Sequence, residues 1–164
     1  MTEPSYSAPI GELTTAVLHL LRATGRAVFD GAFERVEELE QADPTYAANP
    51  VNTRFPYGLL YQLPGGSADP FPDLDMDLRA TTAAFQVTSV SNRRNQCQAV
   101  ARQFHDQLFA RDAAGWVHDL VVPDGWRVIH RAPDPAAPGV DRAGDPTRAI
   151  YSCPARFAIT IAPA

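Results

Sequence analysis

Residues 56–110 constrain the fold of this chain more than any other stretch. Apolar residues alternate at 57–63 and again at 83–90, which is typical of half-buried strands because successive side chains of a strand point to opposite faces. Residues 65–80, between these runs, are rich in Gly, Pro and Asp and too long for a tight hairpin. A segment at 92–111 then has apolar residues at helical spacing. The block therefore predicts two strands joined by a long arm, followed by an amphipathic helix.

The helix predicted at 92–111 has a marked start and a marked buried side. Ser91 or Asn92 is a suitable N-cap. Arg93 and Arg94 fall in the first turn, where the helix dipole disfavours cations, so either a partner carboxylate lies nearby or the placement is a matter of chance. The buried stripe is expected to consist of Cys97, Val100, Ala101, Phe104 and Leu108.

A second helix is predicted before this block, at residues 9–24. Ser7 is a suitable cap, Pro9 suits a first turn and Gly25 supplies a stop. Asp30-Gly31 is a hairpin turn signal, although the run 33–41 fits a short helix equally well.

After the central block, two more strands are predicted, at 126–131 and at about 148–162. The first follows the turn Pro123-Asp124-Gly125. The second contains Pro154, so it should lie at a sheet edge or contain a bulge. The whole pattern predicts an α+β fold in one domain, residues 1–164: a mixed or antiparallel sheet of about four to five strands, with two helices packed on one face and long loops at 42–55, 64–81 and 132–147.

Charge and hydropathy exclude several classes of protein. The 164 residues have a formal net charge of −5, which argues against a sequence-specific nucleic-acid partner held by phosphate contacts. No apolar run of ~18 residues is present, so no membrane span is expected. The first residues lack the basic start of a signal peptide, and two cysteines without metal or redox spacing fit a protein made in the cytosol.

The charge is divided unevenly along the chain. Residues 1–90 contain 5 Arg and 12 Asp or Glu, a net of −7, and residues 91–164 contain 9 Arg and 7 Asp, a net of +2. Opposite signs complement each other either within one domain or between neighbours in a ring. All 14 basic residues are Arg, which pairs with carboxylates in a bidentate manner.

No motif in the sequence supports an enzyme. Asp73, Asp75 and Asp77 alternate like calcium ligands, but Arg79 follows where a calcium loop continues with other residue types, so a solvated acidic arm is the simpler interpretation. Cys97 and His105 lie about 12 Å apart along one helix, too far for a nucleophile and its base. Neither a phosphate-binding loop nor a Gly-x-Ser-x-Gly motif occurs, and neither a cofactor nor a metal is expected.

The chain contains six notable segments in this order: the opening helix, the Asp30-Gly31 stretch, PYGLLYQLPGG, the Ala-Asp-Pro arm, FQVTSVS with the helix after it, and the closing IYSCPARFAITIAPA. Together these segments resemble the tail terminator proteins of long-tailed (siphovirus-like) bacteriophages infecting actinobacteria. The stretch 34–55 does not match the resemblance. The family's architecture, a mixed sheet with two flanking helices, agrees with the fold predicted above.

The resemblance implies a structural virion protein without a cofactor. Such proteins form a homo-hexameric ring that caps the tail tube, ends tube polymerisation and presents a surface to the head connector or head completion protein; the partners are thus the chain itself, the major tail tube protein and the connector. The expected location is the head-proximal end of the tail, and the host cytoplasm during assembly. The alternatives are another head–tail junction protein, or a small α+β enzyme or ligand-binding domain. The expected assembly interface consists of Gly65, Gly66, Asp69, Asp73, Asp75, Asp77, Arg79, Arg93 and Arg94.

Overall fold

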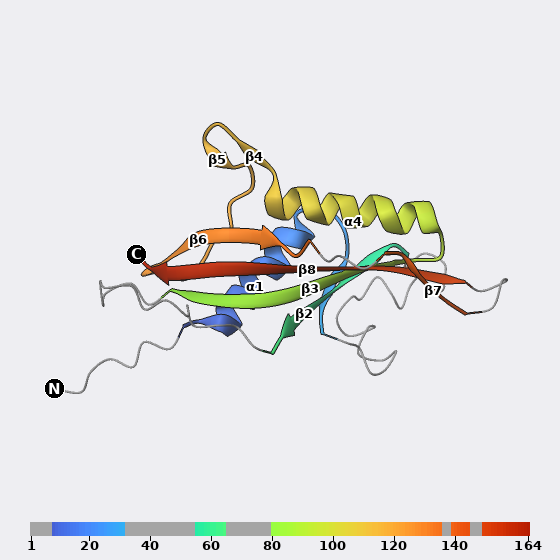
Figure 1. The fold of residues 1–164 in the computed structure, drawn as a ribbon, viewed down its shortest axis with the longest axis horizontal. Coiled ribbons are helices and arrows are strands. Elements are labelled where there is room, and N and C mark those ends of the chain that lie inside the picture. The colour runs from blue at the N-terminus through green and yellow to red at the C-terminus, as the bar shows by residue number, and fades with distance from the viewer. Residues whose placement is uncertain (1–7, 32–54, 65–79, 136–138, 145–148) are drawn as a thin grey trace.

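A mixed six-stranded sheet forms the body of the described chain (Figure 1). The computed structural model describes residues 8–31, 55–64, 80–135, 139–144 and 149–164. The strands follow the order β1-β2-β3-β8-β6, and β7 also pairs with β8. Their bounds are β1 Val28–Asp30, β2 Tyr57–Leu63, β3 Thr81–Ser91, β6 Trp126–Pro133, β7 Asp141–Ala143 and β8 Ile150–Pro163. The α+β class is confirmed, and the short strands β1 and β7 bring the sheet to six strands where four or five were expected.

The short strand β1 corrects the hairpin prediction for Asp30-Gly31. β1 runs parallel to β2, with Val28 opposite Gly58, whereas β2, β3, β8 and β6 pair in antiparallel fashion. Gly31 has a φ of 73° and donates its N–H to the carbonyl of Leu60 at 2.7 Å. The glycine therefore ends an added parallel strand. The short helix considered at 33–41 and most of the loop expected at 42–55 lie outside the described residues.

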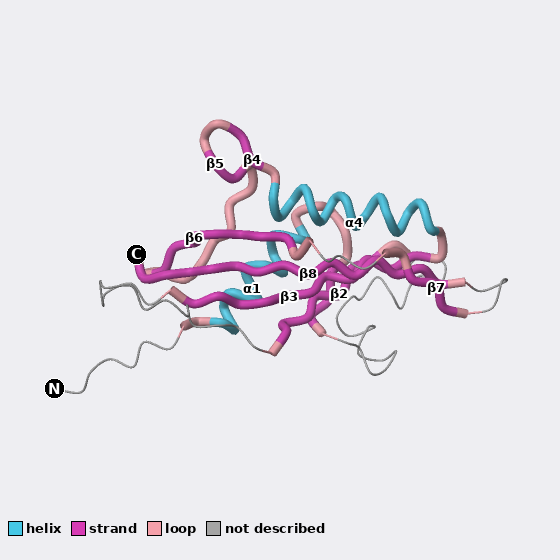
Figure 2. Tube along the Cα trace, viewed as in Figure 1, coloured by secondary structure: helices cyan, strands magenta, loops and turns pink. Residues whose placement is uncertain are grey.

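Two helices cover one face of the sheet, as predicted. Helix α1 spans Ile10–Arg22 and α4 spans Arg94–Phe109. Figure 2 shows the two helices beside the strands of the sheet. Both helices contribute to a single apolar core with the strands, because alternate residues of β3 and β8 are buried against them. The largest buried side chains include Leu13, Phe85, Phe104 and Ile159.

The packing of α4 against β2 is unusually close. The Phe104 ring lies so near Gly58 that a Cβ there would be 2.8 Å from two ring carbons. Cys97, Val100, Phe104 and Leu108 are buried as expected, while Ala101 is only half-buried. This glycine thus permits the helix to approach the sheet.

The start of α4 differs from the predicted cap. Arg93 occupies the N-cap position and makes no side-chain capping bond. Ser91 lies two residues earlier; its hydroxyl accepts the Arg93 N–H at 3.2 Å and donates to Gln96 at 2.7 Å. Ser91 therefore fixes the turn before the helix.

The strand β8 explains how Pro154 is tolerated. β3 pairs along one side of β8, whereas the other side pairs with β7 through Ser152 and with β6 from Phe157 onward. Pro154 falls between these two partners, so β8 has a local edge there, as the proline predicted. The bulge lies elsewhere, between Val128 and His130 of β6. The loop expected at 132–147 is corrected: it contains the end of β6 and the strand β7.

A small hairpin at the end of α4 was not predicted. Strands β4 (Arg111–Asp112) and β5 (Gly115–Trp116) form a separate two-stranded sheet that projects from the body (Figure 1). The Asp112 carboxylate accepts the N–H groups of Ala114 and Gly115 at 2.7 and 3.1 Å, which closes the turn. Gly115 has a φ of 128°.

Candidate assembly surfaces

The predicted interface residues divide between undescribed and described parts of the chain. Gly65, Gly66, Asp69, Asp73, Asp75, Asp77 and Arg79 lie outside the described residues, so the role of this arm stays a prediction. Arg93 and Arg94 are exposed at the start of α4. Neither forms an ion pair with a carboxylate of the described chain, where the one ion pair is His105–Asp106 at 3.4 Å. The structure therefore supplies no intramolecular reason for two cations in this first turn.

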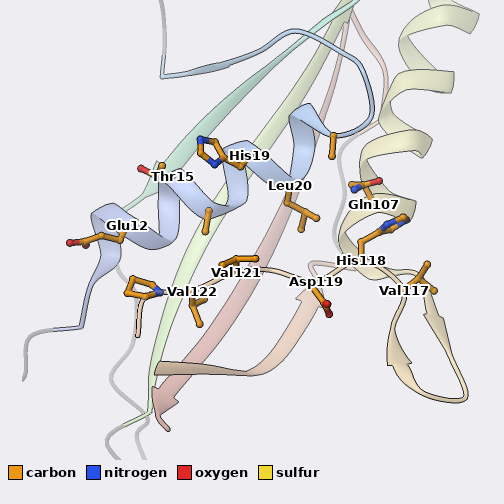
Figure 3. Close-up of a pocket in the computed structure, with 13 residues that line it drawn as sticks. Glu12, Thr15, His19, Leu20, Gln107, Val117, His118, Asp119, Val121 and Val122 are labelled. Carbon is orange, nitrogen blue, oxygen red and sulfur yellow. The ribbon is translucent and has the colours of Figure 1, made fainter. Parts of the chain in front are cut away.

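A groove lies between α1 and the segment that follows the β4–β5 hairpin (Figure 3). Its volume is about 600 Å³. One wall is α1, the end of α4 contributes Gln107, and the opposite rim is residues 117–123. The lining mixes apolar and polar side chains: Glu12, Thr15, Ala16, His19, Leu20, Ala23, Gln107, Val117, His118, Asp119, Val121, Val122 and Pro123.

Exposed valines mark the rim of this groove. Val121 is 81% exposed and Val117 is 48% exposed. Leu120, between them, is buried in the core and anchors the segment. Apolar side chains held out toward solvent beside a concave surface are typical of a site that binds another protein.

A buried arginine fixes the position of the rim. Arg131 is 4% exposed, and its Nη1 donates to the carbonyls of His118 at 2.9 Å and Leu108 at 3.2 Å. Its Nε finds no partner within the described residues. Burial lowers the pKa of Arg131, and the nearby charge of Asp119 opposes that shift. One cation thus joins β6, the end of α4 and the rim.

The ring of Trp116 connects Arg131 to the β4–β5 hairpin. The guanidinium carbons of Arg131 and Arg111 lie 4.9 and 4.6 Å from the centroid of Trp116. Contacts of this kind stabilise by about 0.5–2 kcal/mol, and more when desolvated. The hairpin and the rim are therefore held as one unit against the body.

The face of the sheet away from the helices presents a second surface. Its side chains are mostly half-buried and neutral, and short polar contacts connect neighbouring strands. The Thr82 and Thr160 hydroxyls lie 2.9 Å apart, and Arg156 Nε donates to Gln86 Oε1 at 3.3 Å. Neither helix of the described chain packs on this face.

Within the described residues, no three His, Cys, Asp or Glu side chains are placed to hold a metal ion. Cys97 and Cys153 are free, with their Sγ atoms 3.2 Å apart, and burial together with the bond to Cys97 raises the pKa of Cys153 to about 12. A thiol held protonated in this way is a poor nucleophile. None of the described helices is long and apolar enough to cross a membrane.

The residues that hold the groove rim in place were not predicted from the sequence. Arg131 looked like an ordinary strand residue, and Trp116 fell in a stretch without a predicted element. One signal was available: Leu120-Val121-Val122 is an apolar run outside every predicted helix and strand. Such a run requires either burial or a partner.

Comparison with known proteins yields a structural likeness alone. No protein-family model matches the chain, and no curated protein matches it. A chain in the solved structure "Virion of native gene transfer agent (GTA) particle" is similar to it, with a TM-score of 0.56 and 17% sequence identity. The likeness covers 96% of this chain and 99% of that chain. At this identity it shows a shared fold over nearly the whole of both chains.

Proposed function

We propose that this chain is a structural virion protein of a phage-like particle, and specifically a tail terminator. The observation that supports this most is the likeness to a virion chain over 96% of this chain and 99% of the other. The order of segments in residues 56–110 resembles tail terminator proteins and independently supports the proposal.

The proposed role is mechanical. A homo-hexameric ring of this chain would cap the finished tail tube, end the polymerisation of the major tail tube protein and offer a surface to the head connector or head completion protein. The location would be the head-proximal end of the tail, with assembly in the host cytoplasm. The groove with its exposed valines supports a role in binding other proteins, because its rim is built rigidly from Arg131 and Leu120.

A second candidate is another protein of the head–tail junction, such as a head completion or neck component. The similar structure is that of a whole virion particle, so the likeness supports both roles equally. The two roles differ in what happens to the tube when the protein is absent. Without a terminator the tube keeps growing, whereas without a neck component tails reach normal length and fail to join heads.

Electron microscopy of particles made without this chain tests the proposal. We expect overlong tails that lack heads, and normal length on complementation with the intact gene. Tails of normal length in the absence of the chain would exclude the terminator role. Normal tails separate from full heads would favour the second candidate.

We propose further that the arm at 65–79 makes assembly contacts with a neighbouring subunit or with the tube. Deletion of the arm should give overlong tails although the domain still folds. A matched variant keeps the length and removes the charge by changing Asp69, Asp73, Asp75 and Asp77 to Asn. Normal tail lengths with both variants would show that the arm is dispensable.

Free protein should associate only weakly, because premature rings would compete with tail assembly. Sedimentation velocity over a concentration series should show monomers giving way to larger species. A stable hexamer as the sole species at low micromolar concentration would contradict this expectation.

A further inference from the structure

We infer that two opposite ends of the subunit bind each other head to tail, with a second copy of this chain as the occupant of the groove. The inference rests on the proposed ring and names its contact surfaces. One surface is the groove rim described above. The other, here called the arginine end, consists of Arg93, Arg94, Arg142 and Ile150.

Strand register brings the arginine end together. Tyr151 of β8 lies opposite Ser91 of β3 on one side and opposite Arg142 of β7 on the other. Ser91 comes just before Arg93 and Arg94, and Ile150 is next to Tyr151. The start of α4 and the strand β7 are accordingly found at the same end of the molecule in Figure 1.

The two surfaces lie at opposite ends of α4. Arg94 begins the helix, and Gln107, which lines the groove, lies near its end. Thirteen residues separate them, which is about 20 Å at 1.5 Å per residue. A subunit with two different surfaces at opposite ends makes the heterologous contact that a ring requires.

The charges of the two surfaces are complementary. Arg93, Arg94 and Arg142 are exposed and unpaired among the described residues, and with the neighbouring Asp141 they sum to +2. Glu12 and Asp119 line the groove, and the groove lining contains no Arg. Arg131, behind the rim, offsets part of the Asp119 charge. Charge pairing across the contact would set its orientation and its rate of formation more than its strength.

Apolar side chains supply the centre of the contact. In the described chain, the large hydrophobic residues that are exposed are Val117, Val121, Ile129 and Ile150. Val117 and Val121 belong to the groove rim, and Ile150, 43% exposed, belongs to the arginine end. Burying such side chains between subunits is favourable by roughly 25 cal/mol per Å² of apolar surface. The contact would also explain two cations in the first turn of α4, because carboxylates of the next subunit would pair with them.

Chemical cross-linking tests the contact directly, because the chain has no lysine. The substitution Arg94→Lys gives the arginine end a single reactive side-chain amine. A zero-length carbodiimide should then join position 94 to Glu12 or Asp119 of another copy, identified by mass spectrometry of the linked peptides. Arg102→Lys, exposed on the same helix, is the matched control and should give at least tenfold less of these products. Equal yields from the two variants, or links to other carboxylates only, would overturn the inference.

Charge reversal supplies a second test that does not depend on cross-linking. Glu12→Arg with Asp119→Arg should weaken self-association at least tenfold by sedimentation, and so should Arg93→Glu with Arg94→Glu. In a mixture of the two reversed proteins each groove faces an arginine end of opposite charge on the other variant, so the mixture should self-associate as the parent does. Failure of the mixture to associate, or a parent protein that stays monomeric up to concentrations of about 1 mM, would overturn the inference.

The two proposals fail in different ways. Tails of normal length in the absence of the chain would exclude the terminator role, whatever the cross-links show. Overlong tails in its absence, together with cross-links that avoid Glu12 and Asp119, would keep the terminator role and exclude this contact.

Discussion

The helix-covered face of the sheet and the rim of the groove are held in place by different means. Phe85, Phe104 and Ile159 are each packed among other apolar residues of the core. The rim at 117–123 is held by the guanidinium group of Arg131, by the buried Leu120 and by Val122, which packs against the core. Apolar packing therefore stabilises the body, whereas a few specific contacts set the position of the exposed rim.

Removal of the Phe104 ring should have the largest effect. Phe104→Ala leaves a cavity between α4 and β2, and we expect the free energy of unfolding to fall by about 3–5 kcal/mol in urea denaturation. Arg102→Ala, on the exposed side of the same helix, should change it by less than about 0.5 kcal/mol. Similar losses from both variants would mean that the core does not dominate the stability of the body.

Adding a methyl group at the same contact should lower the free energy of unfolding by a somewhat smaller amount. Gly58→Ala places a Cβ 2.8 Å from the Phe104 ring, which must shift, and we expect a loss of about 1–3 kcal/mol. The control is Gly11→Ala, because nothing lies within 4 Å of a Cβ at that helical position. Gly11→Ala should leave stability unchanged or raise it by up to about 1 kcal/mol. A neutral Gly58→Ala would show that α4 moves freely over the sheet.

Loss of the buried cation should affect the rim more than the body. Arg131→Leu leaves the carbonyls of Leu108 and His118 without this donor, and we expect about 1–2 kcal/mol of lost stability. Amide hydrogen exchange should rise in 116–121 while α1 and β3 stay protected. Arg127→Leu, exposed on the same strand, is the control. Equal loss of protection in β3 would contradict the separation of rim and body.

Alkaline pH should cause the smallest loss of stability, and this loss depends on the buried Cys153 thiol in the body. The pKa of Cys153 is raised from 9.0 to about 12 in the folded protein, so the unfolded chain ionises first as pH rises. This contribution is therefore complete below pH 9 and is lost between pH 9 and 12, on the order of 1 kcal/mol by pH 10. The parent should lose stability over pH 8–10.5 more steeply than Cys153→Ala. Parallel curves would show that the thiol is not buried in solution.

Much of the body could be predicted because burial leaves a period in the sequence. The spacing of Val100, Phe104 and Leu108 predicted α4, and the alternation in 57–63 and 83–90 predicted β2 and β3. The α+β class and the packing of both helices on one face followed from these patterns. The presence of Pro154 predicted that its strand would be at a sheet edge or contain a bulge, and β8 is unpaired on one side at that residue.

The candidate site was predictable only in part. Arg93 and Arg94 stood out in the sequence because their charge opposes the helix dipole. The roles of Arg131, Trp116 and Val121 could not be predicted, because the residue type alone does not reveal whether a side chain is buried or exposed. The length and charge of the arm at 65–79 predicted an assembly interface there, and this role remains a prediction.

The sequence by itself therefore determined the two helices, the longer strands β2, β3, β6 and β8, and most of the residues that these elements bury, since these depend on neighbours a few residues away. Only the tertiary structure decided that β1 lies parallel to β2, that β7 and β6 share one side of β8, and that Arg131 reaches the carbonyl of His118. The physical reason is that such contacts join residues far apart in the chain. The free energy of each contact depends on both partners, and the pattern of residues around one partner does not identify the other.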